Sequence, residues 1–84
     1  ASNKAQENAE DDIEAAIKEI EAAQIKNLDV VIGLAASGKT PYTVAGIKRA
    51  RELGAFTIGI ANNAGTPLLT ESDVGILLET GPEV

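Results

Sequence analysis

The chain of 84 residues contains no cysteine and no histidine, and it also lacks methionine and tryptophan. Without cysteine no disulfide or thiolate site can form, and without histidine the commonest metal ligand and general base is absent. Zinc sites, Ser-His-Asp catalysis and Cys-His catalysis are therefore excluded within this chain. With one Phe and one Tyr as the only aromatic residues, a core must be built from Ile, Val, Leu and Ala.

Basic residues are few, since 7 Lys and Arg face 13 Asp and Glu, for a net charge of −6. This balance argues against nucleic-acid binding through a basic face. No apolar run approaches the ~20 residues of a membrane span, and the polar, acidic first residues do not resemble a signal peptide. We therefore expect a cytoplasmic protein with neither a nucleic-acid partner nor a membrane partner.

The hydrophobic pattern predicts helices that alternate with buried strands. Apolar residues recur at helical spacing from about residue 7 to Gln24, and again from Pro41 to a stop at Gly54. Short runs rich in β-branched residues lack polar alternation, as is typical of strands buried on both faces of a parallel sheet. These strands are expected at 30–34, 56–60 and 74–78, with a short helical turn at 68–71.

This order of elements predicts an α/β fold, a three-layer open parallel sheet with flanking helices. Ligands of such sheets bind beyond the carboxyl ends of the strands, and the loops at 35–40 and 61–67 both fall on that edge. A chain of this length forms one small domain at most. Because so small a parallel sheet needs helices on both faces, the chain is expected to be part of a larger domain.

The loop after the first strand organises the functional prediction. In residues 33–42, GLAASGKTPY, small residues and the hydroxyls of Ser37 and Thr40 precede a helix N-terminus, an arrangement typical of an anion site. Phosphate is the first candidate ligand. Thr40 is expected to cap the helix, Pro41 to occupy its first turn, and Gly38 to let the backbone approach a ligand without a Cβ.

The same loop also satisfies the nucleotide-binding pattern G-x-x-x-x-G-K-[ST] between Gly33 and Thr40. In that interpretation Lys39 contacts the terminal phosphates and Thr40 holds Mg²⁺. Nucleotide hydrolysis also needs an acidic metal ligand at the end of a neighbouring strand. The second strand is followed by Ala-Asn-Asn at 61–63, which leaves only Glu79 after the third strand. Since the pattern has few fixed positions, nucleotide binding is the weaker alternative.

Several segments resemble, in order, the sugar isomerase (SIS) domain of the N-acetylmuramic acid 6-phosphate etherases. Beyond the central loop and the strand before it, the similar segments are ENAED at 7–11, ARELGA at 50–55, NAGTP at 63–67 and GPEV at 81–84. The resemblance thus covers residues 7–84. The chain departs from the family pattern at Lys39, where Arg is usual, at Asn62, where Ser or Cys is usual, and at Ala64, where Pro is usual.

The resemblance implies a lyase of amino sugar catabolism and peptidoglycan recycling. Such enzymes cleave the D-lactyl ether of N-acetylmuramic acid 6-phosphate and release N-acetylglucosamine 6-phosphate and D-lactate. Ring opening acidifies the C2 proton, a base removes it, the C3 ether oxygen leaves with acid assistance, and water adds. No metal and no cofactor are needed. The resemblance implies Glu10 as one of two acid/base carboxylates, and Ser37, Gly38, Lys39 and Thr40 as the substrate-binding residues.

Members of the family are several times longer than this chain. The resemblance therefore implies that residues 1–84 are an internal part of a single SIS domain, without its N-terminal strand and its C-terminal elements, and inactive in isolation. A homodimer, or association with the missing part of the domain, is expected. A non-catalytic or regulatory sugar-phosphate-binding SIS module remains an alternative, and a P-loop nucleotide-binding protein a less favoured one.

Overall fold

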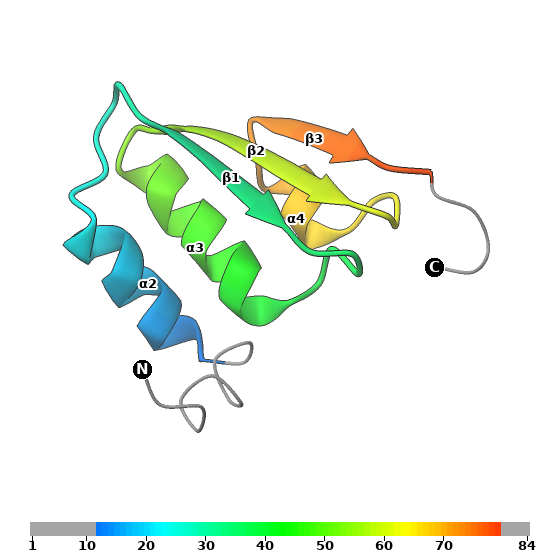
Figure 1. Cartoon of the computed structure of the whole chain (residues 1–84), viewed down its shortest axis with the longest axis horizontal. Helices are drawn as coiled ribbons and strands as arrows, with labels where there is room; N and C mark the ends of the chain where they lie inside the picture. Colours follow the sequence, from blue (N-terminus) through cyan, green and yellow to red (C-terminus); the bar gives the residue numbers. More distant parts are fainter. Residues whose placement is uncertain (1–11, 80–84) are drawn as a thin grey trace.

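A computed structural model describes residues 12–79, which form helices and strands in strict alternation (Figure 1). The elements are α2 (Ile13–Ala22), β1 (Val30–Leu34), α3 (Pro41–Glu52), β2 (Phe56–Ala61), α4 (Pro67–Thr70) and β3 (Val74–Leu77). Each predicted helix and strand is present. The first helix ends at Ala22, two residues before the predicted end, and Gln24 follows with a positive φ of 57°. The predicted start of this helix near residue 7 lies outside the described residues.

The strands form a three-stranded parallel sheet in the order β1-β2-β3. Val30 pairs with Phe56 at one end of β1, and Ile58 pairs with Val74 where β3 begins. Because all strands run the same way, the loops after β1 and β2 emerge at one edge, as the sequence predicts. The parallel α/β architecture is thereby confirmed.

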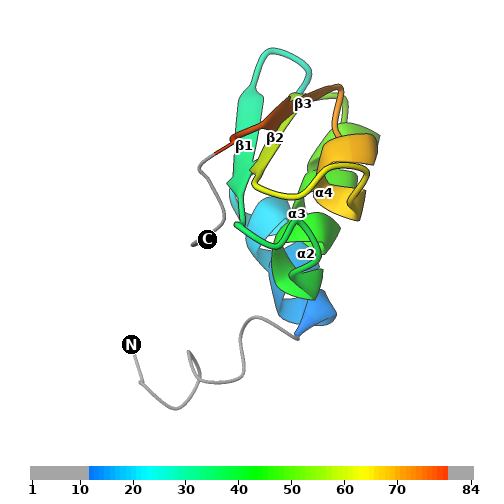
Figure 2. The same cartoon turned by 90° about the vertical axis from the view of Figure 1, so that its right-hand side faces the viewer.

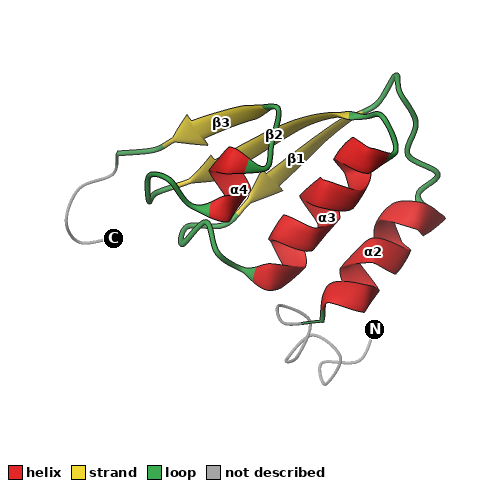
Figure 3. Cartoon of the chain, turned by 180° about the vertical axis from the view of Figure 1, so that it is seen from behind, coloured by secondary structure: helices red, strands yellow, loops and turns green. Residues whose placement is uncertain are grey.

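The described helices cover one face of the sheet (Figure 2). On this side α3 packs on β1 and β2, α4 packs on β2 and β3, and α2 lies against α3 (Figure 3). Ile47 of α3 and Leu68 of α4 are fully buried between the layers. The strands present small residues here, and Gly59 allows the closest approach, since a Cβ at this position would lie 2.2 Å from the carbonyl oxygen of Leu68.

The opposite face of the sheet is apolar and uncovered by any described element. Strand alternation places alternate residues of each strand on this face. They are Val30, Ile32 and Leu34 of β1, Phe56, Ile58 and Ile60 of β2, and Val74 and Ile76 of β3, with Leu78 beyond it. Ile32 is 60% exposed and Leu34 is 68% exposed. Residues 12–79 thus supply two of the three expected layers, the sheet and one layer of helices.

No helix within residues 12–79 has the length and apolar character that a membrane span requires.

Candidate phosphate-binding site

The loop at 35–40 joins β1 to α3 beside the loop at 62–66, which joins β2 to α4 (Figure 1). Both lie at the carboxyl edge of the sheet. The first loop closes as a tight turn in which the N–H of Gly38 donates to the carbonyl oxygen of Ala35 at 3.0 Å, and Gly38 has a φ of 73°. The edge predicted to bind a ligand therefore carries two loops in direct contact.

The two hydroxyls predicted as phosphate ligands lie together. Ser37 Oγ and Thr40 Oγ1 are 3.5 Å apart, and the backbone N–H of Lys39 donates to Ser37 Oγ at 3.1 Å. Thr40 stands at the N-cap position of α3, but its side chain makes no capping hydrogen bond, so the predicted side-chain cap is wrong. The described contact of its hydroxyl is with Ser37 instead, at the surface of the loop.

Several backbone donors of the loop and of the first turn of α3 are unbonded within residues 12–79. Within the described part of the chain, the N–H groups of Ala36, Ser37 and Thr40 make no hydrogen bond to protein. The first-turn N–H groups of Tyr42 and Thr43 also lack an intrahelical partner, as in any helix, and Thr40 does not cap them. Unbonded N–H groups at a helix N-terminus favour an anion because the helix dipole is positive there.

The carbonyl groups of the loop, by contrast, are bonded to the second loop. Ala36 O accepts from the N–H of Asn62 at 2.9 Å and from Asn63 Nδ2 at 3.3 Å. Asn63 Nδ2 also lies 3.5 Å from the carbonyl oxygen of Ser37, and Gly38 O accepts from the N–H of Leu68 at 2.9 Å. The carbonyl oxygens of the loop thus accept hydrogen bonds from protein, whereas several of its N–H groups are unbonded within residues 12–79.

Gly38 is required by the second loop, whatever ligand the site binds. A Cβ at Gly38 would lie 2.0 Å from Thr66 Oγ1 and 2.6 Å from Thr66 Cβ. Thr66 is 5% exposed, and its hydroxyl donates to the carbonyl oxygen of Asn63 at 2.9 Å. The sequence predicts a glycine at a ligand-binding turn, and the structure adds a packing reason that no local pattern contains.

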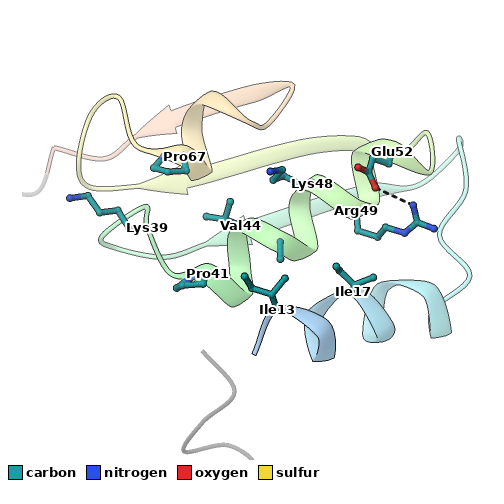
Figure 4. A pocket seen from close by; sticks show the side chains of 10 residues that line it. Ile13, Ile17, Lys39, Pro41, Val44, Lys48, Arg49, Glu52 and Pro67 are labelled. Atoms are coloured by element: carbon teal, nitrogen blue, oxygen red, sulfur yellow. Dashed lines mark hydrogen bonds and ion pairs between the residues drawn. The ribbon is translucent and has the colours of Figure 1, made fainter. Parts of the chain in front are cut away.

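Lys39 is exposed and forms no ion pair with another described residue. It lies at one end of a groove of about 400 Å³ between α2 and α3, which is lined mainly by apolar residues such as Ile13, Ile17 and Val44. Its amine points away from the centre of this groove (Figure 4). Neither Ser37 nor Thr40 lines the groove, so it is separate from the paired hydroxyls.

Asp73 makes structural hydrogen bonds away from the two loops. Asp73 Oδ2 accepts from the N–H of Thr57 at 2.8 Å and from its hydroxyl at 2.9 Å, and Asp73 Oδ1 accepts from Arg51 at 3.0 Å. The hydrogen bonds from Thr57, followed by the charge of Arg51, hold the pKa of Asp73 below its ordinary value. This carboxylate joins β2 to the turn before β3 and lies outside the two loops.

The acidic residues predicted to take part in chemistry lie outside the two loops. Glu10, the predicted acid/base residue, lies outside the described residues. Glu79 is exposed and follows β3. The loop at 62–66, which follows β2, contains no acidic residue. Across residues 12–79, no group of three or more Asp, Glu, His or Cys could hold a metal ion.

Residues 8–84 match the SIS domain family. The chain belongs to this family. Curated relatives named N-acetylmuramic acid 6-phosphate etherase include proteins from Geobacillus thermodenitrificans and Deinococcus radiodurans, each 46% identical over 84 residues. The alignments cover 100% of this chain and 28% of each relative, so this SIS chain spans little more than a quarter of their length.

Solved structures agree with the SIS assignment. A protein from Bacillus subtilis, provisionally assigned as a phosphosugar isomerase, superposes with a TM-score of 0.71 at 31% identity, over 82% of this chain and 22% of that chain. A Salmonella typhimurium protein with the same provisional assignment gives a TM-score of 0.69 at 34% identity, over 79% of this chain and 20% of that chain. The predicted family and fold are therefore confirmed.

Proposed function

We propose that this chain is the sugar-phosphate-binding part of an N-acetylmuramic acid 6-phosphate etherase, a carbon-oxygen lyase. The observation that carries the proposal is the loop at 35–40, where unbonded N–H groups and two adjacent hydroxyls meet the N-terminus of α3. Identity of 46% to curated etherases over the full chain supports the choice of this activity among SIS proteins.

In the proposed complex the phosphate accepts hydrogen bonds from the N–H groups of Ser37 and Thr40 and from both hydroxyls. Gly38 holds the turn that exposes these donors, and the Lys39 amine adds positive charge. Charge-assisted hydrogen bonds of this kind are stronger than neutral ones, and the helix dipole adds to them. Fixing the phosphate in this way anchors one end of the sugar and leaves C2 and C3 free for chemistry.

The chemical step requires two carboxylates with separated pKa values, one to remove the C2 proton and one to assist departure of the C3 oxygen. We assign Glu10 to one of these roles, and its partner to a part of the SIS domain outside these 84 residues. The chain by itself is therefore expected to bind the sugar phosphate without releasing lactate. A lactate assay on the purified chain checks this, since any turnover would contradict the division of the acid/base pair. The reaction is proposed to occur in the cytoplasm.

The proposal that these residues are one part of an SIS domain also accounts for the open face of the sheet. We infer that helices from the remainder of the SIS domain cover Ile32, Leu34 and their neighbours, because parallel sheets are covered on both faces. The isolated chain should then self-associate through this surface, and Ile32→Glu should shift it toward monomer in sedimentation experiments. Unchanged association in this variant would place the contact elsewhere. We propose that the whole protein is a homodimer, and sedimentation of a full-length relative tests this.

The proposal is tested by titrating the chain with N-acetylglucosamine 6-phosphate while backbone amides are followed by NMR. Shifts centred on Ser37 to Thr40 with the sugar phosphate, and none with unphosphorylated N-acetylglucosamine, are expected. Ser37→Ala should weaken binding, whereas Thr70→Ala, an exposed hydroxyl on α4, should not. Shifts with ATP and Mg²⁺ alone would refute the proposal in favour of a P-loop. Absence of any shift from a folded chain would also count against it.

A further inference from the structure

The second loop determines which way the peptide groups of the phosphate loop face. In a planar trans peptide the C=O and the N–H point in opposite directions. The carbonyl group of Ala36 and the N–H of Ser37 belong to one peptide group. Because Ala36 O is bonded to Asn62 N–H and to Asn63 Nδ2, the N–H of Ser37 must point away from the second loop. This N–H has no protein partner among residues 12–79.

The next two N–H groups of the turn already donate to protein acceptors. The N–H of Gly38 is used within the turn, by Ala35 O, and the N–H of Lys39 is used by Ser37 Oγ. The peptide between Ala36 and Ser37 has a donor that is unbonded among the described residues, and its carbonyl oxygen is held by the second loop. The peptide between Ala35 and Ala36 also has an N–H that is unbonded there, but its carbonyl oxygen is bonded within the turn, by the N–H of Gly38. Two groups of the second loop hold the Ala36 carbonyl oxygen, the backbone N–H of Asn62 and the side-chain amide of Asn63, and of these Asn63 contributes the side chain.

Asn63 is itself held in place by a buried group. Thr66 Oγ1 donates to the backbone carbonyl of Asn63, and Thr66 packs against Gly38 without room for a Cβ between them. Leu68 N–H bonds Gly38 O and ties the start of α4 to the same turn. The second loop thus contacts the carbonyl oxygens of Ala36, Ser37 and Gly38. Asn63 is the residue of the second loop whose side chain makes such contacts.

We propose that Asn63 is a positioning residue of the phosphate site, whose side-chain amide clamps the carbonyl groups of Ala36 and Ser37 so that the Ser37 N–H faces the anion. The inference rests on the proposed function, because it takes the sugar phosphate as the ligand. Asn63 does not contact the phosphate in this scheme. It acts through the backbone of the loop.

Asn63→Ala is the test, and Asn62→Ala is its matched control. Asn62 is the adjacent residue of the same type, but its side chain donates to the carbonyl oxygen of Leu78, toward β3, and its backbone N–H bonds the loop. Loss of the clamp should weaken binding of N-acetylglucosamine 6-phosphate by about fivefold, as expected for one neutral hydrogen bond. Asn62→Ala should leave the dissociation constant within about twofold of the parent value.

A readout without ligand separates positioning from general destabilisation. In Asn63→Ala the Ser37 amide resonance should shift, and ¹⁵N relaxation should report greater mobility at residues 36–38, while the urea midpoint remains close to that of Asn62→Ala. Equal binding by the two variants would overturn the inference. If the unsubstituted chain binds no sugar phosphate, the proposed function fails, but the relaxation measurement still tests the clamp. Unchanged relaxation at residues 36–38 in Asn63→Ala would overturn the clamp.

Discussion

Replacement of Gly38 by alanine should destabilise the chain through two separable effects. The first is conformational, because Gly38 has a φ of 73° and a non-glycine residue in the left-handed region costs about 1–2 kcal/mol. The second is steric, because the new Cβ would lie 2.0 Å from Thr66 Oγ1 and 3.1 Å from Ala61 Cβ. Overpacking of this kind typically costs about 1–3 kcal/mol. The expected total is about 2–5 kcal/mol in the free energy of unfolding, against about 5 kcal/mol for a typical small domain.

Thr66 has little room to relieve the clash. Its side chain is 5% exposed, and its hydroxyl is bonded to Asn63 O. Urea unfolding followed by far-ultraviolet circular dichroism measures the loss. Gly65→Ala is the matched control, since Gly65 has a φ of 71° but a Cβ there would meet nothing within 4 Å. Gly65→Ala should therefore show the conformational cost alone, and the difference between the variants isolates the contact with Thr66.

The contact can be checked by a double-mutant cycle. Combining Gly38→Ala with Thr66→Gly removes both atoms nearest the new Cβ, so the two substitutions together should cost less than the sum of their separate effects. If Gly38→Ala destabilises no more than Gly65→Ala, or if the cycle shows strict additivity, the two loops are not interlocked as described. That result would also remove the physical basis of the clamp at Asn63.

Three further predictions concern the scaffold. Gly46→Ala in the middle of α3 should stabilise the chain by about 0.5–1 kcal/mol in urea unfolding, because alanine favours helix and its Cβ would meet Ile20 Cγ1 at an ordinary 3.7 Å. Asp73 has a lowered pKa in the folded state, so its contribution to stability is present above the unfolded value of 3.8 and is lost as pH falls through the lower folded value. Asp73→Asn should remove this part of the acid dependence of the urea midpoint. The pKa of Tyr42 is raised above 10.0, first by its hydrogen bond to Glu19 and then by desolvation, and ultraviolet titration of this single tyrosine should show late ionisation that Glu19→Gln reverses.

Each of these has a contradicting outcome. A destabilised Gly46→Ala would show that α2 and α3 pack more tightly than the distance to Ile20 indicates. An unchanged acid transition in Asp73→Asn would mean that the hydrogen bonds from Thr57 do not persist in solution. Because a raised pKa favours the protonated folded state, stability from Tyr42 should be present below pH 10.0 and decline as pH rises through the folded value. A normal titration of Tyr42 would refute its contact with Glu19.

Much of the fold could be predicted because its signals are local. The runs Val30–Leu34 and Phe56–Ala61 combine β-branched residues with the absence of polar alternation, and they form two neighbouring strands of the parallel sheet. Pro41 sits in the first turn of α3 as its fixed φ favours. The order of these elements also predicts that two loops share one edge, and the SIS match confirms the resemblance seen in the motifs.

The interlock of the loops could not be predicted, because it depends on contacts between residues distant in sequence. Asn63 and Thr66 carry an ordinary turn signal, which does not reveal that they hold Ala36 and Gly38. The side-chain cap expected of Thr40 failed for a related reason, since capping propensity ignores a competing hydroxyl at Ser37. The need for a cover on the second face of the sheet could be predicted, because a parallel sheet is buried on both faces, but apolar composition does not say what covers it.

The division of the sheet into a side of small residues and a side of large ones has a consequence for how substitutions would be tolerated. On the helical side, Gly33, Gly59 and Gly75 admit no added carbon, because a Cβ at each would approach α3 or α4 to within 3.0 Å. On the other side, bulky residues such as Leu34 are largely exposed to solvent in residues 12–79. A saturation-mutagenesis library of the isolated chain should therefore accept polar residues at alternate strand positions and reject enlargement at the intervening ones. In a library of a full-length relative both sets of positions should be intolerant, the glycine positions because no room exists for a larger residue and the positions of large residues because a covered apolar face excludes a polar one.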